Sequence, residues 1–132
     1  MVVAGPAAAY QPHAAAVIAL VTEYLTAINN HDYLSYRSLL SAGLRQIETL
    51  QRFQAGYRTT ADSAATLSAI GTGRGGRLTA TFTFTSHQAP ADSPTHAGCN
   101  VWQISLYLLP QGRTYLIGKP PPGYRASYQP CP

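Results

Sequence analysis

The sequence carries little charge. Only 11% of its 132 residues are Asp, Glu, Lys or Arg, against about a quarter in an average domain. Nine basic residues outnumber five acidic ones and give a formal net charge of +4, but they are scattered along the chain without a run or a helical stripe. Because a nucleic-acid interface requires such a cluster, we expect no nucleic acid as a partner. No acidic patch points to a cationic partner either.

Long apolar runs are also missing. No segment approaches the roughly 18 apolar residues that a membrane-spanning helix needs, so we expect no membrane insertion by this chain. Residues 1–12, MVVAGPAAAYQP, lack a basic start and are interrupted by Gly5-Pro6, which excludes an intact targeting signal there. We expect this segment to be a flexible leader before one domain of residues 13–132.

The chain contains only two cysteines, Cys99 and Cys131. Their separation is too long for a structural zinc site, and the histidines show no metal-ligand spacing. We therefore expect no metal and no other cofactor. The histidines are His13, His31, His87 and His96.

The two cysteines predict a disulfide. A bridge between Cys99 and Cys131 would close a loop of about 33 residues and stabilise the fold by about 3.5–4 kcal/mol through loop entropy. It would also hold down a proline-rich tail. The alternative is two unpaired thiols in a cytosolic protein. We expect the disulfide, and with it an extracytoplasmic protein, secreted or tethered to the surface.

The first half of the chain has helical periodicity. Apolar residues recur every three or four positions over residues 13–29, which predicts an amphipathic helix. Asp32 is a natural N-cap for a second helix over residues 33–40. The same spacing predicts a third helix over residues 44–57. The apolar stripe of the first helix comprises Val17, Leu20, Val21, Tyr24 and Ile28.

The second half alternates with the period of strands. Residues 77–88, RLTATFTFTSHQ, predict a central strand with Phe82 and Phe84 turned to the helices and the threonines on the other face. A weaker strand is expected before it, over residues 64–71, and two after it, over residues 100–109 and 114–118. The tract Pro120-Pro121-Pro122-Gly123 is expected to end regular structure.

The glycine-rich segment GTGRGG, residues 71–76, lies between two of these predicted strands. A phosphate-binding loop requires a helix N-terminus directly after it. No such helix is predicted here, so the segment is interpreted as a hairpin turn.

Helices followed by an antiparallel meander, with Trp102 in the penultimate strand, resemble the nuclear transport factor 2-like, or cystatin-like, α+β fold. The segment YLTAINNHDYLSYRSLLS resembles the opening helical hairpin of its members. The segments FTFTSHQ, CNVWQISLYLL and YLIGKPPPGYRA, with the cysteine near the C-terminus, resemble actinobacterial secreted domains, some of them extracellular parts of membrane-anchored serine/threonine kinases. The resemblance implies N-terminal helices packed on a curved antiparallel sheet of about four strands, with a cone-shaped apolar cavity between them.

Two sets of candidate site residues follow. The first could line a ligand pocket, although such residues also serve as ordinary core. Steroid isomerases, which share this fold, provide the second set, because their oxyanion-stabilising tyrosine falls on Tyr24 and their catalytic carboxylate on Glu48. In that family, however, the carboxylate lies on a strand after the hairpin, whereas Glu48 lies in a predicted helix. The second acidic donor of the family lies on a late strand, whereas Asp92, the only acid after Asp62, lies in a loop. The pocket candidates are Tyr24, Tyr36, Phe82, Phe84, Trp102 and His87.

We therefore expect a non-catalytic extracytoplasmic binding or sensor domain. Its partner would be a small apolar molecule in the cone or a protein on the face of the sheet. A first alternative is a small isomerase- or cyclase-type enzyme that acts on a ketone-like substrate, with Tyr24 as donor and Glu48 as base. A second alternative is a structural module that forms a homodimer through its sheet.

Overall fold

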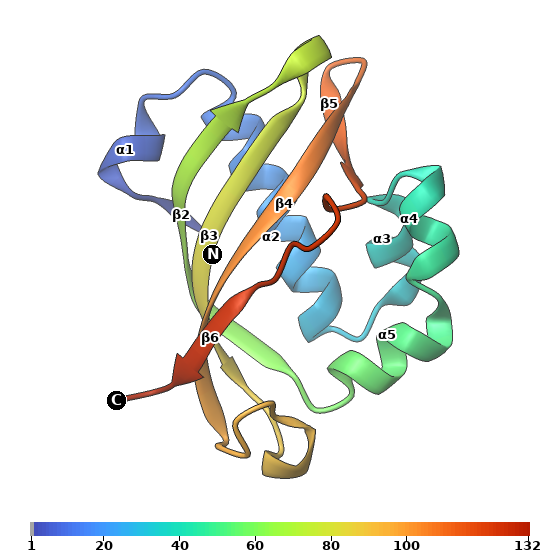
Figure 1. Ribbon diagram of the computed structural model, residues 1–132, viewed down its shortest axis with the longest axis vertical. Coiled ribbons are helices and arrows are strands. Elements are labelled where there is room, and N and C mark those ends of the chain that lie inside the picture. The colour runs from blue at the N-terminus through green and yellow to red at the C-terminus, as the bar shows by residue number, and fades with distance from the viewer. Residues whose placement is uncertain (1) are drawn as a thin grey trace.

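The computed structural model describes residues 2–132 and shows an α+β fold (Figure 1). Helices fill most of the first half of the chain, and a mixed, mostly antiparallel sheet fills the second half. The helices are α1 (Pro6–Ala9), α2 (Ala14–Asn29), α3 (Tyr33–Ser38), α4 (Ala42–Ile47) and α5 (Leu50–Tyr57). The strands are β1 (Val3–Ala4), β2 (Ala61–Thr72), β3 (Leu78–His87), β4 (Cys99–Gln111), β5 (Thr114–Gly118) and β6 (Ser127–Pro130).

Helix α2 forms because its apolar stripe packs against the sheet. Val17, Val21 and Ile28 lie on that stripe and are almost completely buried. The helix runs behind β2, β3 and β4, while α3, α4 and α5 lie to one side of them (Figure 1). Of the helices within residues 2–132, none is long and apolar enough to cross a membrane.

The prediction of one continuous third helix is wrong, because residues 44–57 form parts of two helices. The backbone of Glu48 leaves the helical region, with φ −87° and ψ 75°. Thr49 then acts as the N-cap of α5, and its hydroxyl accepts a hydrogen bond of 3.2 Å from the Arg52 N–H. A capping side chain that satisfies a free N–H group at a helix start favours a new helix over continuation of the old one.

The central strand β3 is confirmed. Its residues alternate between buried and half-buried positions, with Phe82 and Phe84 buried and the threonines on the other face. Strand β3 pairs antiparallel with β2 and β4, and the β4 register places Ile104 opposite Phe82 and Trp102 opposite Phe84. Register shifts in β2 mark bulges, which bend the strand. The glycine-rich segment connects β2 to β3 as predicted, and Gly75 takes a positive φ of 65° there.

Both ends of the chain differ from the sequence prediction. The expected flexible leader packs against the sheet: β1 pairs in parallel with β2, the Gly5 N–H donates to the Leu67 carbonyl at 2.8 Å, and Ala8 is fully buried. The proline tract does not end regular structure, because β6 follows it and pairs antiparallel with β4. The outer edge of β4 is therefore shared by β5 at one end and β6 at the other.

Candidate ligand-binding cavity

A cavity of about 320 Å³ lies between the helices and the inner face of the sheet and is partly open to solvent. Its volume falls at the small end of the range of about 300–1,000 Å³ that is usual for small-molecule sites. Most of its lining is apolar or aromatic. The apolar and aromatic residues of the lining include Tyr24, Ile28, Tyr36, Leu40, Leu44, Tyr57, Phe84, Trp102, Ile104, Leu106, Tyr107, Ile117 and Tyr124.

One end of the cavity is polar. Thr60, Asp62, Ser86 and Gln88 line it at the point where β2 begins and β3 ends. The register pairs Asp62 with Ser86, and the alternation of β3 that turns Phe84 inward also turns Ser86 inward. Gln88 Nε2 donates a hydrogen bond of 2.8 Å to Thr60 Oγ1. Thr60 and Ser86 are both buried, so this polar group forms part of the interior.

Asp62 is held in place through its backbone. The side chain of Asn29, the last residue of α2, accepts a hydrogen bond of 2.7 Å from the Asp62 N–H. The same side chain donates one of 2.9 Å to the Asp62 carbonyl. This two-point contact fixes the start of β2 against the end of α2, which leaves the Asp62 carboxylate to line the cavity.

The carboxylate of Asp62 lies in an environment that disfavours its charge. Burial raises the pKa of Asp62 from 3.8 to about 6, and the neighbouring Ser86 hydroxyl partly offsets the rise. Within residues 2–132, the buried Oδ1 atom of Asp62 has no hydrogen-bond partner, and the same is true of Gln88 Oε1. A carboxylate whose pKa lies near neutrality, in a cavity, is typical of functional sites.

Three tyrosines, one from each of α2, α3 and α5, line the cavity near its polar end. The rings of Tyr24 and Tyr36 are 5.7 Å apart, and those of Tyr36 and Tyr57 are 6.0 Å apart. Burial raises the pKa of all three hydroxyls, and the negative charge of Asp62 adds to the rise for Tyr24 and Tyr57. The phenols therefore stay protonated at neutral pH and remain hydrogen-bond donors.

Glu48 also lines the cavity, but its setting differs from that of Asp62. Its side chain is 21% exposed and lies 3.7 Å from Arg52, itself mostly exposed. Glu48 acts electrostatically on Tyr36, Asp62 acts on Tyr24, and both act on Tyr57. Asp62 lies at the start of β2, the strand that follows the helices, whereas Glu48 lies at the end of α4.

Of the other candidates from the sequence, the structure places some in the cavity lining and others outside it. Tyr24, Tyr36, Phe84 and Trp102 line the cavity together. Phe82 is fully buried beside Tyr24 and Phe84 and does not line it.

Two candidates from the strand end and the following loop lie elsewhere. His87 is exposed at the end of β3, on the opposite side of the strand from Ser86. Asp92 forms a 2.9 Å ion pair with Arg58 and lies outside the lining.

Sequence reasoning missed the polar end of the cavity. The sequence predicts no role for Asp62, which precedes the strand expected over residues 64–71, and it places Ser86 and Gln88 only at the end of the strand expected over residues 77–88. One signal could have found Asp62: it is the acid that follows the last predicted helix. Tyr57, which lies on the apolar spacing of the third predicted helix, also lines the cavity.

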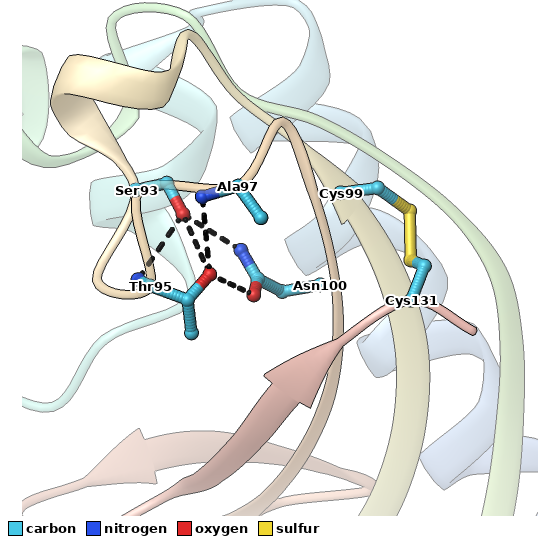
Figure 2. The surroundings of a disulfide bond; sticks show 6 residues. All are labelled: Ser93, Thr95, Ala97, Cys99, Asn100 and Cys131. Carbon is cyan, nitrogen blue, oxygen red and sulfur yellow. Dashed lines mark hydrogen bonds between the residues drawn. A yellow bond between two sulfur atoms is a disulfide. The ribbon is translucent and has the colours of Figure 1, made fainter.

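The cysteines form the disulfide that the sequence predicts, with their Cα atoms 5.5 Å apart (Figure 2). Next to it, the buried Asn100 donates to Ser93 Oγ at 2.8 Å and accepts from Thr95 Oγ1 at 2.6 Å, which ties the loop before β4 to the strand.

The disulfide also fixes β6, and the segment that leads into β6 forms one wall of the cavity. Pro120, Tyr124 and Ala126 belong to this wall. Between the parts of β4 that pair with β5 and β6, the Ser105 N–H donates a hydrogen bond of 2.7 Å to the Tyr124 hydroxyl. The C-terminal tail is therefore part of the site.

No protein-family model matches the chain, and no curated protein matches it. Among solved structures, it is similar to a ketosteroid isomerase-like protein from Erwinia carotovora atroseptica SCRI1043, with a TM-score of 0.60 and 13% sequence identity. The match covers 82% of this chain and 92% of that one. The fold is ketosteroid isomerase-like, of the nuclear transport factor 2-like type. At this identity the likeness concerns the fold alone, and the resemblance to actinobacterial secreted domains gains no support from it.

The nuclear transport factor 2-like fold accounts for the position of the cavity. Helices on one face of a curved sheet leave a space that side chains of both layers line, and here that space holds two carboxylates and several phenols. In residues 2–132 no group of three or more His, Cys, Asp or Glu side chains could hold a metal ion. The lining side chains themselves offer hydrogen-bond donors and acceptors and two carboxylates.

Proposed function

We propose that this protein is an extracytoplasmic binding or sensor domain that holds a small, largely apolar molecule in its cavity. The observation that carries the proposal is the cavity itself, with about 320 Å³ of mainly apolar lining and one polar end. An apolar body would displace water from the aromatic walls, while the polar end would orient it. The Cys99–Cys131 disulfide supports the extracytoplasmic part of the proposal, because such bonds persist in oxidising compartments.

The chain offers a direct probe of binding. Trp102 is its only tryptophan and lines the cavity, so intrinsic fluorescence reports a molecule that enters. We expect 4-phenylbutanol, a neutral apolar alcohol, to change the Trp102 emission in a saturable way.

A pair of neighbouring substitutions controls the experiment. Ile104→Phe adds a ring that fills part of the cavity, whereas Gln103→Phe adds the same ring on the exposed face of β4. The first should abolish the response and the second should preserve it. Equal responses in the two variants would place the binding site elsewhere, and no response in the unaltered protein to any of a panel of apolar molecules would refute the proposal.

One observation favours a second candidate function, an enzyme that moves a proton next to a carbonyl. A general base works best when its pKa lies near the operating pH, and burial brings the pKa of Asp62 to about 6 beside the protonated phenol of Tyr24. In this version Asp62, rather than Glu48, would remove the proton while Tyr24 donates a hydrogen bond to the carbonyl oxygen.

The test of this second function is the exchange of α-hydrogens for deuterium in 4-phenyl-2-butanone dissolved in D2O, followed by NMR. The unaltered protein should accelerate exchange, Asp62→Asn should remove the acceleration, and Glu48→Gln should retain most of it. Exchange at the buffer rate in all three would exclude this activity. A protein partner on the sheet face and a homodimer through the sheet stay predictions.

A further inference from the structure

The polar groups of the cavity carry charge of one sign. Two carboxylates, those of Glu48 and Asp62, line it, and the lining formed by residues 2–132 contains no Lys, Arg or His. This contrasts with the chain as a whole, whose formal net charge is +4. No acidic patch appears in the sequence, because these two acids lie far apart in it and only the fold brings them to the same cavity.

The negative charge of Asp62 is not balanced by the protein. Glu48 has Arg52 at 3.7 Å at the outer surface, and Arg58 is engaged with Asp92 at 2.9 Å. The groups that face Asp62 from the packed helices are the hydroxyls of Tyr24 and Tyr57, which are neutral, and the cross-strand group is the neutral Ser86.

Hydrogen-bond acceptors at the polar end also exceed the available donors. In the part of the chain that the structure describes, Asp62 Oδ1 and Gln88 Oε1 are buried and have no hydrogen-bond partner. The Gln88 amide group is already used, since its Nε2 donates to Thr60. Buried acceptors without donors are rare in native proteins and each is unfavourable, so two that line one cavity point to donors supplied from outside the chain.

The rest of the lining is suited to a cation with an apolar body. Aromatic faces attract a positive charge through their quadrupoles, and apolar side chains complete the walls. The aromatic residues of the lining are Tyr24, Tyr36, Tyr57, Phe84, Trp102, Tyr107 and Tyr124.

We propose that the molecule bound in this cavity is a protonated organic amine. Its N–H groups would donate to Asp62 Oδ1 and Gln88 Oε1, and its apolar part would lie along Trp102 and Ile104. An ammonium group supplies both a charge and several donors, whereas an alcohol supplies one donor without charge. A carboxylate would place acceptors and a like charge against Asp62. This inference rests on the proposed binding function and specifies its ligand class.

Three probes with the same phenylbutyl body test the inference: 4-phenylbutylamine, 4-phenylbutanol and 4-phenylbutyrate. Binding is followed by Trp102 fluorescence at about pH 8. We expect the amine to bind about tenfold or more tightly than the alcohol, because hydrogen bonds to charged groups are stronger than neutral ones. The carboxylate should bind most weakly.

The Asp62→Asn variant assigns the preference to one side chain. It should lose most of the preference for the amine, so that the amine and the alcohol bind with similar affinity. Glu23→Gln is the matched control, because Glu23 is an acid on α2 that lies outside the cavity. This control removes the same charge from the whole chain and should leave the amine preference unchanged.

The pH dependence provides an independent readout. Since the pKa of Asp62 is about 6, its carboxylate becomes protonated as the pH falls from about 8 to about 5, and amine affinity should fall with it by more than alcohol affinity does. His31, which contacts the Tyr57 carbonyl at 3.0 Å, is retained in Asp62→Asn. If amine affinity does not change with pH in Asp62→Asn, His31 is therefore excluded as the source of the pH dependence.

Each outcome decides a separate question. If the alcohol binds as tightly as the amine, or the carboxylate binds best, the charge inference is wrong while the binding function stands. If Asp62→Asn keeps the full amine preference, Asp62 is not the recognition group. If none of the three probes binds and no other apolar molecule changes the Trp102 emission, the proposed function fails together with the inference.

Discussion

Replacement of Asp62 by asparagine should make the protein more stable at neutral and alkaline pH. The native environment raises the pKa of Asp62 from 3.8 to about 6, so the folded protein binds this proton more tightly than the unfolded chain does. Stability therefore falls as the pH rises from about 4 to about 6, and the full penalty is present above that range. The asparagine side chain has nearly the same shape as that of Asp62 and carries no charge at any pH.

The size of the effect follows from the shift. A rise of about two pKa units corresponds to about 3 kcal/mol of differential interaction, at about 1.36 kcal/mol per unit. Asp62→Asn should thus raise the free energy of unfolding by about 2–3 kcal/mol at about pH 8 and change it little at about pH 4. A residue that destabilises the fold is expected where the site serves function rather than stability.

Urea unfolding of the two proteins at a series of pH values measures this difference directly. Subtraction removes the contributions of Asp32 and Asp92, whose pKa values are lowered by hydrogen bonds from Ser35 and from Thr59 and Arg58, because both acids are present in each protein. A stability difference that is independent of pH, or a variant that is less stable at about pH 8, would refute the reasoning about the Asp62 environment.

Three further predictions concern the framework around the cavity. Replacement of Cys99 and Cys131 together by serine should lower the free energy of unfolding by about 3.5–4 kcal/mol, measured by urea unfolding without reductant; an unchanged midpoint would contradict the disulfide. Thr49→Ala should lower stability by about 1 kcal/mol in the same assay through loss of the N-cap of α5, whereas a neutral effect would argue for one continuous helix. Tyr124→Phe should lower the free energy of unfolding by about 1 kcal/mol through loss of the hydrogen bond from Ser105. It should also weaken the response of Trp102 to 4-phenylbutanol. Unchanged stability together with an unchanged response would exclude a role for the tail as a cavity wall.

The sequence predicts well those elements whose burial follows a simple period. The helical stripe of α2 and the alternation of β3 each reflect one buried face, so Val17, Val21 and Phe82 could be placed in the core from spacing alone. The Cys99–Cys131 bridge could be predicted because it closes a long loop and holds down the proline-rich tail.

The break between α4 and α5 shows where periodicity misleads. Ile47 and Leu50 keep the apolar spacing across the break, yet both are exposed in the structure. The spacing therefore did not report burial there, and the local capping by Thr49 decided the outcome. Strand β6 has no alternation to detect, since it forms through pairing with β4 beside the disulfide.

The polar end of the cavity depends on contacts that sequence spacing does not encode. Asn29 positions Asp62 through the backbone, from a helix end to a strand start. Asp62 and Ser86 become neighbours only through the β2–β3 register. The aromatic residues Tyr24 and Trp102 were identified by type, but their common cavity required the fold.

The most direct test of the account is an experimental structure of the protein with 4-phenylbutylamine. We predict the phenyl ring inside the cavity beside Trp102 and the nitrogen atom within about 3 Å of Asp62 Oδ1, the usual distance of a charged hydrogen bond. A structure in which the side chains of Trp102, Ile104 and Tyr124 fill that volume, with no amine bound at saturating concentration, would contradict it.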